Sequence, residues 1–331
     1  MRKLASIRII DGIEPIVGAD FIEIAKIGGW KVIVKKGEFA VNNAVVYFEI
    51  DSFIPHELAP FLSKGKKPRE YNGVKGEILR TIKLRGQVSQ GLILKMSDLF
   101  DDPSRFEIGQ DVSALLNIQK YEKPIPANLS GKVSGRFPTH LVRKTDQERI
   151  QNIFNDVSDL DDEYEVTLKL DGTSCTLISY GSDYKVCSRN LELDLDSDSD
   201  NSYIRIFNKY FESLKMIDNY AIQGEIMGPG IQGNRENLSD IEFYVFDIYD
   251  ITNQKYLLPH ERLRLVEYLN MKHVPIIEMN AKLSSTVEEE IELANNQRSI
   301  NNPIAEGRVY KSMNSSTSFK VISNKFLLKE E

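Results

Sequence analysis

The first 118 residues contain short apolar runs that alternate with polar residues or are rich in β-branched residues. Such runs are typical of β-strands, and residues that favour turns separate them. The runs lie at Ala5–Ile10, Trp30–Val34, Ala44–Ile50, Ile78–Leu84 and Gly91–Lys95. This part of the chain is therefore predicted to be β structure with about five short strands.

Five short strands with a loop-rich middle favour a small closed barrel of the OB type over residues 1–118. Gly18–Ile27 is predicted to form a short helix within this domain. Residues 119–140 hold Pro124, Pro126 and Pro138 among several glycines and serines, which is typical of a linker.

Residues 141–331 mix helix and strand patterns without a regular βαβ alternation, which predicts an α+β domain. The first helix is expected over Thr145–Asn155, because Thr145 and Glu148 form a capping-box pattern before apolar residues at helical spacing. Further helices are expected at Tyr203–Lys215, Pro259–Leu269 and Val287–Gln297. Strands are expected at Tyr164–Leu170, Ser174–Tyr180, Tyr184–Ser188, Tyr220–Met227, Glu242–Ile248, Gly307–Lys311 and Ser318–Val321.

Composition excludes several classes of protein. Hydrophobic residues make up 41% of the chain and charged residues 27%, the balance of a globular protein. Charged residues break every long apolar run, so no membrane span is expected, and Asp11 and Glu14 argue against a secretory signal. Cys175 and Cys187 are too few for a disulfide scaffold or a zinc site. We expect a soluble, intracellular protein, and no obligate protein partner is evident.

The distribution of charge matters more than the net charge of −7. Residues 1–118 carry 17 Lys and Arg against 15 Asp and Glu, and residues 64–85 alone hold eight basic and two acidic residues. A local basic stripe favours contact with phosphates, and Lys64, Lys66 and Lys67 are the candidates for nucleic-acid binding. A solvated surface loop is the alternative interpretation.

The most informative segment is EVTLKLDGTSCTLISYG, residues 165–181, in which a predicted strand ends at Lys169. A lysine at a strand end acts as a nucleophile when its amine is unprotonated, which burial or nearby cations favour. Lys-Leu-Asp-Gly is also an ordinary hairpin sequence, since Asp-Gly is a common turn. The lysine alone therefore does not establish a catalytic site.

Four further segments place acidic, aromatic and basic residues within predicted strands or at their ends. GEIMGPGIQGN carries Glu225, FYVFDIYD carries Phe246, AEGRVYK carries Glu306, and SFKVISNKF carries Lys320. Each residue alone is also explained as a surface charge or a core aromatic residue. The ordered series is the informative feature.

With Arg189 in Ser188-Arg189-Asn190, this series resembles the motifs of the covalent nucleotidyltransferase superfamily, which includes ATP-dependent RNA ligases, DNA ligases and mRNA capping enzymes. GEIMGPGIQGN, FYVFDIYD and the C-terminal SFKVISNKFLLK are most similar to RNA ligases. KLASIRII, GGWKVIVKKGEF and VVYFEIDSFIP are similar to the branch with an OB domain before the catalytic domain. The chain departs from the pattern at Ile322, where a second lysine is common, and at Arg308, where an aliphatic residue is common.

The resemblance implies an ATP-dependent RNA ligase that seals nicks between a 3′-hydroxyl and a 5′-phosphate in RNA repair, through a lysyl-AMP intermediate. The implied fold is an N-terminal OB barrel (1–118), a linker (119–140) and a nucleotidyltransferase domain (141–331). The implied substrates are ATP and a nicked RNA or RNA/DNA duplex, with Mg²⁺ or Mn²⁺. The implied roles are Lys169 as nucleophile, Glu306 as metal ligand, and, for nucleotide binding, Arg149, Arg189, Glu225, Phe246, Lys320 and Lys325.

Three alternative functions share these features. A DNA ligase would use the same motifs on an all-DNA nick, and a capping guanylyltransferase would use GTP and stop after one transfer. A non-catalytic nucleic-acid-binding protein with an OB domain is the alternative from a different class, and the full set of motif residues argues against it.

Overall fold

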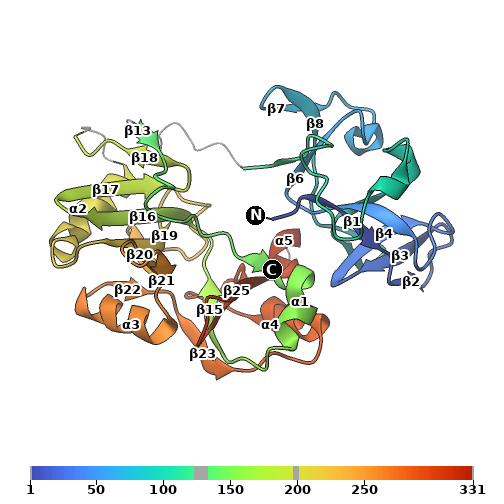
Figure 1. Cartoon of the computed structure of the whole chain (residues 1–331). Coiled ribbons are helices and arrows are strands. Elements are labelled where there is room, and N and C mark those ends of the chain that lie inside the picture. Colours follow the sequence, from blue (N-terminus) through green and yellow to red (C-terminus); the bar gives the residue numbers. More distant parts are fainter. Residues whose placement is uncertain (1, 123–132, 197–200, 330–331) are drawn as a thin grey trace. The chain divides into compact units, whose positions relative to one another are not determined.

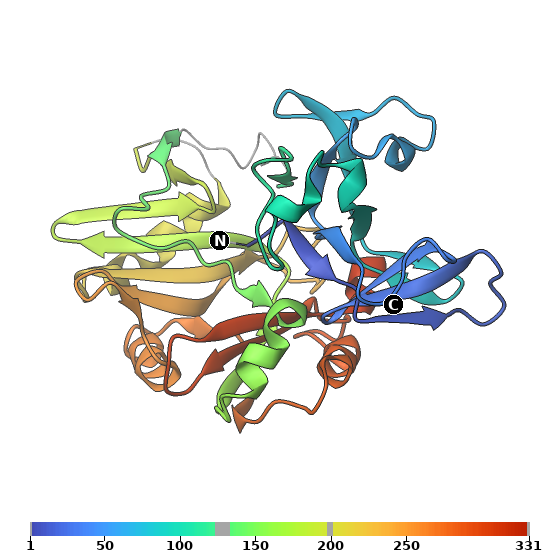
Figure 2. The ribbon, with the colours of Figure 1, turned by 45° about the vertical axis from the view of Figure 1, so that its right-hand side comes forward.

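The computed structural model describes residues 2–122, 133–196 and 201–329, and the chain divides into two compact units, Met1–Pro124 (unit 1) and Ile125–Glu331 (unit 2). Figure 1 shows the whole chain and Figure 2 a second view. None of the helices in the described part of the chain is long and apolar enough to cross a membrane.

Unit 1 is built almost entirely from short antiparallel strands. The sheets in its described residues are β1 (Ala5–Ile9), β5 (Ala44–Phe48) and β11 (Leu92–Lys95); β2 (Gly12–Pro15), β3 (Ile22–Ile27) and β4 (Trp30–Lys35); β12 (Gln119–Lys120), β6 (Ser52–Pro55), β8 (Val74–Ile78) and β7 (Arg69–Tyr71); and β9 (Ile82–Leu84) with β10 (Gln87–Ser89). Short 3-10 turns are η1 (Pro60–Ser63), η2 (Met96–Asp98) and η3 (Pro103–Arg105).

The alternation seen in the sequence is the burial pattern of these strands. In β4, Trp30, Val32 and Val34 are buried while Lys31 and Ile33 are less so, as expected where successive side chains point to opposite faces. Two sequence predictions were wrong. Gly18–Ile27 contains strand β3, not a helix, because Ile22–Ile27 pairs on both sides with β2 and β4. The predicted strand Ile78–Leu84 is divided between β8 and β9.

Unit 2 contains two sheets in its described residues. The eight-stranded sheet has the order β13 (Val133–Arg136), β18 (Leu191–Leu193), β17 (Asp183–Ser188), β16 (Thr173–Tyr180), β19 (Tyr220–Met227), β20 (Glu242–Asp250) and β21 (Lys255–Tyr256), with β22 (Lys272–His273) paired to β20. The five-stranded sheet has the order β14 (Glu148–Arg149), β25 (Ser318–Ile322), β24 (Gly307–Ser312), β15 (Tyr164–Lys169) and β23 (Ile276–Ala281).

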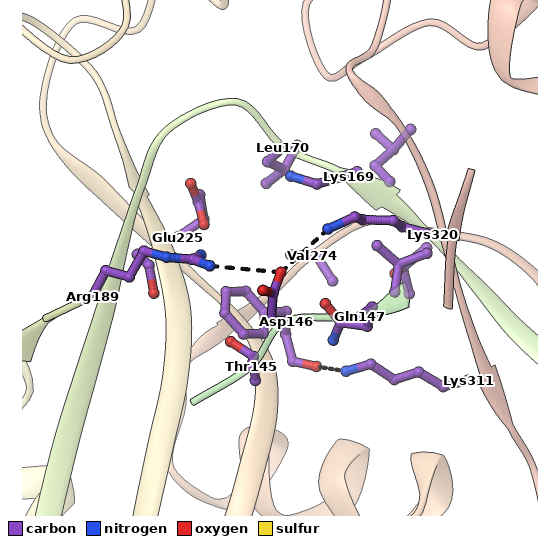
Figure 3. Close-up of a pocket in the computed structure, with 15 residues that line it drawn as sticks. Thr145, Asp146, Gln147, Lys169, Leu170, Arg189, Glu225, Val274, Lys311 and Lys320 are labelled. Atoms are coloured by element: carbon purple, nitrogen blue, oxygen red, sulfur yellow. Dashed lines mark hydrogen bonds and ion pairs between the residues drawn. The ribbon is translucent and has the colours of Figure 1, made fainter. Parts of the chain in front are cut away.

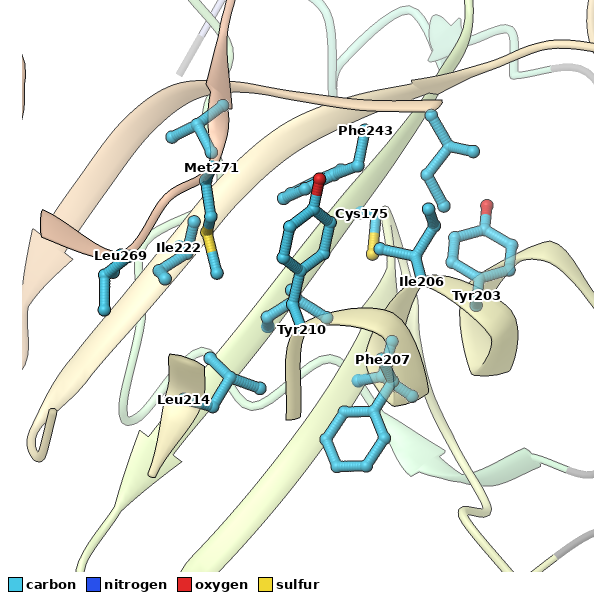
Figure 4. Close-up of a cluster of buried hydrophobic side chains, with 14 of the residues drawn as sticks. Cys175, Tyr203, Ile206, Phe207, Tyr210, Leu214, Ile222, Phe243, Leu269 and Met271 are labelled. Carbon is cyan, nitrogen blue, oxygen red and sulfur yellow. The ribbon is translucent and has the colours of Figure 1, made fainter. Parts of the chain in front are cut away.

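Each sheet is covered by its own helices (Figures 1 and 2). Helices α2 (Ser202–Leu214) and α3 (Pro259–Tyr268) contact the eight-stranded sheet, while α1 (Ile150–Ser158) and α4 (Val287–Asn296) contact the five-stranded sheet, and α5 (Asn324–Leu328) follows β25. Under α2, residues such as Ile206 and Leu214 pack on Ile222 and Phe243 of the strands (Figure 4). Burial of apolar surface contributes about 25 cal/mol for each Å² removed from water. It supplies most of the driving force for folding.

The first helix of unit 2 begins later than the sequence predicts. Glu148 and Arg149 form β14, which pairs in parallel with Phe319 and Lys320, so α1 starts at Ile150 with Arg149 as its N-cap. The predicted capping box is therefore wrong. Instead, the Glu148 carboxylate accepts hydrogen bonds from the Arg149 backbone N–H and the Asn152 amide, each at 2.9 Å.

The predicted linker, residues 119–140, includes two described strands. Gln119–Lys120 pairs with β6 of unit 1, and Val133–Arg136 pairs with β18 of unit 2. Residues 123–132 of the predicted linker lie outside the described residues. The boundaries predicted at 118 and 140 stay predictions.

Candidate active site

A pocket in unit 2 gathers side chains from both sheets (Figure 3). The five-stranded sheet contributes residues of β15, β24 and β25, and the eight-stranded sheet contributes residues of β16, β19 and β20. The pocket is lined by Thr145, Asp146, Gln147, Thr167, Leu168, Lys169, Leu170, Ser174, Arg189, Glu225, Phe246, Val274, Val309, Lys311 and Lys320.

Lys169 lies at the end of β15, with its Nζ 2.7 Å from Oε2 of Glu306. Strand pairing explains this contact, because Lys169 is paired with Gly307 of β24 and Glu306 directly precedes that glycine. Burial lowers the pKa of the Lys169 ammonium. The negative charges of Glu306 and Glu225 outweigh burial, so the pKa of Lys169 is raised above its ordinary value. Without another cation, the pocket therefore holds Lys169 in its protonated form.

Glu225 lies on β19 and accepts a hydrogen bond of 3.1 Å from the Gly172 backbone N–H. Burial raises the pKa of the Glu225 carboxyl to about 8, although Lys169 acts in the opposite direction. Glu306, which forms the ion pair with Lys169, contributes more than Glu225 to the raised pKa of the lysine. The two acidic residues have different environments and are suited to different tasks.

The glycine of Lys-Leu-Asp-Gly is required by close packing. A Cβ built on Gly172 would lie 2.3 Å from the Ile226 carbonyl oxygen and 2.9 Å from the Glu225 side chain. The connection between β15 and β16 therefore passes directly against β19, and only glycine fits there. This contact sets the position of Glu225 relative to Lys169.

The apolar part of the pocket comes from opposite sheets. Phe246 of β20 and Val309 of β24 both line it, and Phe246 is half-buried. An aromatic face beside an aliphatic side chain is suited to a flat heterocycle, which gains dispersion and stacking energy there. The cationic residues Arg189 and Lys320 line the same pocket, so it can bind a molecule with both a flat base and an anionic group.

Asp146 pairs with both of these cations, and it was missed by the sequence analysis. Its Oδ1 lies 3.6 Å from Nη2 of Arg189 and 3.4 Å from Nζ of Lys320 (Figure 3). The sequence placed Asp146 inside a helix, where its contact with residues 43 and 174 positions away carried no local signal. Lys311 was also missed, although it lies in the quoted segment AEGRVYK.

Other predicted site residues lie elsewhere. Arg149 is buried at the start of α1 and is not among the described residues that line this pocket. Lys325 lies on α5, where its Nζ donates a 3.0 Å hydrogen bond to Asn296, and it too is absent from the described lining. Lys64, Lys66 and Lys67 are exposed residues of unit 1, with Lys64 at the end of η1. Their predicted roles stay predictions.

A lysine at a strand end beside an acidic partner, in a pocket lined by an aromatic residue and cationic side chains, agrees with the class that the sequence resembles, the covalent nucleotidyltransferases. Comparison with known proteins is more specific. A family model of an OB-fold domain matches residues 4–96, and a family model described as RNA ligase matches residues 162–324. The search of curated proteins gave no match.

Solved structures of the RNA ligase of Naegleria gruberi are similar to the whole chain. A mutant with AMP and Mn is 43% identical, with a TM-score of 0.91 and coverage of 100% of each chain. A mutant with ATP and Mn is 42% identical, with a TM-score of 0.91 and coverage of 99% of this chain and 100% of that one. The structure with PPi is 43% identical, with a TM-score of 0.90 and coverage of 99% and 98%. The chain belongs to the RNA ligase family, with an N-terminal OB domain before the ligase domain.

The position of Asp146 predicts a competition. Asp146→Asn removes the carboxylate that pairs with Arg189 and Lys320, so these cations become more available to an anionic ligand. Exposed or partly exposed ion pairs are worth about 0.2–1 kcal/mol, so inorganic pyrophosphate is expected to bind up to about fivefold more tightly. Isothermal titration calorimetry of wild type and variant measures this. Weaker pyrophosphate binding by the variant would show that Asp146 supports the anion site.

Proposed function

We propose that the protein is adenylylated by ATP on Lys169 and seals nicks between a 3′-hydroxyl and a 5′-phosphate in an RNA or RNA/DNA duplex. The observation that carries the proposal is the placement of Lys169, 2.7 Å from Glu306, in one pocket with Glu225, Phe246, Arg189 and Lys320. The solved structures of one similar protein, the Naegleria gruberi RNA ligase, with ATP, AMP and PPi support the same proposal.

The proposed reaction has three transfers. In the first, the lone pair of the Lys169 amine attacks the α-phosphorus of ATP, a P–N bond forms with loss of an amine proton, the bond from the α-phosphorus to the bridging oxygen breaks, and pyrophosphate leaves. In the second, an oxygen of the 5′-phosphate attacks the same phosphorus, the P–N bond breaks, and Lys169 leaves as an amine that takes up a proton. In the third, the 3′-hydroxyl attacks the activated 5′-phosphate, loses its proton and displaces AMP. All three depend on in-line positioning and charge neutralisation.

The roles proposed for the lining residues follow from their chemistry. Phe246 stacks on the adenine, and Val309 lines the same pocket. Glu225, whose carboxyl pKa is raised to about 8 by burial, binds a ribose hydroxyl. Arg189 and Lys320 bind phosphate or ribose in exchange for Asp146. Arg149 and Lys325 would act only after local movement brings them to the nucleotide.

A divalent cation fits the acidic part of this site. Glu306 offers hard oxygen ligands of the kind that Mg²⁺ and Mn²⁺ prefer. Within the described residues no group of three or more His, Cys, Asp or Glu side chains is close enough to enclose a metal. The cation would therefore be held by Glu306 together with phosphate oxygens and water, and would neutralise charge on the phosphate. By pairing with Glu306 it would also release the proton from Lys169.

Unit 1 is proposed to bind the nucleic acid. Its exposed Lys64, Lys66 and Lys67 begin the basic stretch 64–85, and OB folds often bind oligonucleotides. The proposed setting is intracellular, which agrees with the buried thiols of Cys175 and Cys187.

Lys169→Met separates the steps of the reaction. Methionine has a similar length but no amine, so incubation with labelled ATP is expected to give no protein adenylate on a denaturing gel. The same variant is expected to seal a pre-adenylylated nick, because the last step does not use the lysine as nucleophile. Lys185→Met, which removes a lysine that pairs with Glu192 away from the pocket, is the control and should label normally. Labelling of Lys169→Met by ATP, or of wild type by GTP alone, would contradict the proposal.

The raised pKa of Lys169 predicts a pH dependence. Below that pKa, the fraction of Lys169 present as the neutral amine increases about tenfold per pH unit. The rate of single-turnover adenylylation at limiting Mg²⁺ should therefore increase from about pH 6 to pH 7.5. This range lies below the pKa of Glu225, about 8. Saturating Mg²⁺ should move the profile to lower pH, because Glu306 then no longer holds the proton. A rate independent of pH at limiting Mg²⁺ would contradict this account of Lys169.

Replacing Lys64, Lys66 and Lys67 together by alanine tests the role of unit 1. If all three contact phosphates, the slope of log affinity for a nicked duplex against log salt should decrease by about one unit per lysine. Self-adenylylation should be unchanged, since the nucleotide pocket is lined by residues of unit 2. The triple arginine variant retains the charges and should bind like wild type. An unchanged salt dependence in the alanine variant would exclude these lysines from the interface.

A further inference from the structure

A β-bulge in β20 lies at the residue that contributes the aromatic face of the pocket. Gln223 of β19 pairs with Asp247, whereas the next residue, Gly224, pairs with Val245. Phe246 is therefore the extra residue of the bulge. A bulge of this kind interrupts the hydrogen-bond ladder and changes the direction of a side chain, and such bulges are frequent beside active sites.

The carbonyl oxygen of Phe246 is bonded from the opposite sheet. Lys311 of β24 donates a hydrogen bond from its Nζ to this oxygen, and the same Nζ lies 2.8 Å from Oδ1 of Asp247, the next residue of the bulge. Figure 3 shows Lys311 entering from the five-stranded sheet beside the labelled residues of the pocket. One ammonium group thus holds both residues of the bulge to the neighbouring sheet.

Lys311 is in turn fixed by a buried network of charges. Asp247 lies 3.8 Å from Nη1 of Arg262 on α3, and Arg262 pairs with Glu165, which is opposite Lys311 in the pairing of β15 with β24. Arg262 and Glu165 are fully buried and Asp247 and Lys311 nearly so. Burial lowers the pKa of Lys311 to about 8, with Asp247 opposing this, so Lys311 is still mostly charged at neutral pH. Buried charges that are paired and hydrogen-bonded restrict the geometry of the groups they join.

We infer that Lys311 is a positioning residue for the base-binding site: it holds the bulge at Phe246 from the opposite sheet and so directs the phenyl ring toward the nucleotide. The inference rests on the proposed function, in which Phe246 stacks on adenine. The sequence places Phe246 and Lys311 65 residues apart, and only the meeting of the two sheets brings them together.

The test is a double-mutant cycle on self-adenylylation of the full chain, with the ATP KM and kcat measured for each variant. Phe246→Ala should raise the KM for ATP about 5- to 100-fold, because this is about the loss of affinity expected when base stacking is removed. Lys311→Met should raise the KM about fivefold or more with a smaller change in kcat, because the interaction lost is with the base and not with the reacting phosphate. The double variant should have the KM of Phe246→Ala alone, within about twofold, because Lys311 acts through Phe246.

Tyr310→Phe is the matched control. Tyr310 is the neighbouring residue on β24, is buried, and donates a hydrogen bond to Glu290 away from the pocket. This variant should lower the melting temperature and leave the KM for ATP unchanged. Lys311→Met also removes the ion pair between Lys311 and the buried Asp247 carboxylate, which can prevent folding. If this single variant does not fold, the double variant Lys311→Met/Asp247→Asn replaces it. The same cycle with Phe246→Ala is then measured on that background.

The outcomes separate the two proposals. A wild-type protein that forms no adenylate with ATP overturns the proposed function. A wild-type protein that forms adenylate, together with a folded Lys311→Met variant whose KM is within twofold of wild type, overturns only the positioning role. The positioning role is also overturned if the KM of the double variant shows the product of the two single effects. Residues that act independently of each other give this result.

Discussion

The register between β15 and β24 is the constraint on which the candidate active site depends. It pairs Lys169 with Gly307 and so places Glu306 beside the lysine. Gly307 allows the next strand to approach closely, because a Cβ there would lie 2.1 Å from the Val321 carbonyl oxygen. A slip of one residue would turn the lysine to the other face of the sheet and away from its carboxylate. The chemistry thus depends on backbone pairing before it depends on any side-chain contact.

The candidate active site needs residues from both sheets of unit 2. Lys169, Glu306 and Lys320 come from the five-stranded sheet or a residue next to it, while Glu225 and Phe246 come from the eight-stranded sheet and Arg189 from the connection between its strands β17 and β18. Two charged bridges join these sets: Asp146 connects Arg189 to Lys320, and Asp247 connects to Lys311. The first bridge is partly exposed and can yield to an anionic ligand, whereas the second is buried and persists. In the proposed function, the pocket is therefore adjustable on the side proposed to bind phosphate and fixed on the side proposed to bind the base.

The sequence predicted the parts of this site that have local signals. Lys169 lies at a strand end, Glu225 follows a glycine and Phe246 lies within an apolar strand, and the motifs around them were sufficient to predict a shared site. Asp146 and Lys311 could not be predicted in this way, because their partners are 43 to 174 residues away and only the fold brings them together. The start of α1 was mispredicted for a similar reason. A local capping pattern favoured Thr145, but pairing of Glu148–Arg149 with β25 kept this segment extended.

The central claim is that Lys169 is the residue that carries AMP. The most direct measurement is mass spectrometry of peptides after incubation with ATP and Mg²⁺, under alkaline conditions that preserve a phosphorus–nitrogen bond. We expect one added AMP on the peptide that contains Lys169, and mild acid should release it. AMP on a peptide that contains Lys311 or Lys320 and not Lys169 would contradict it.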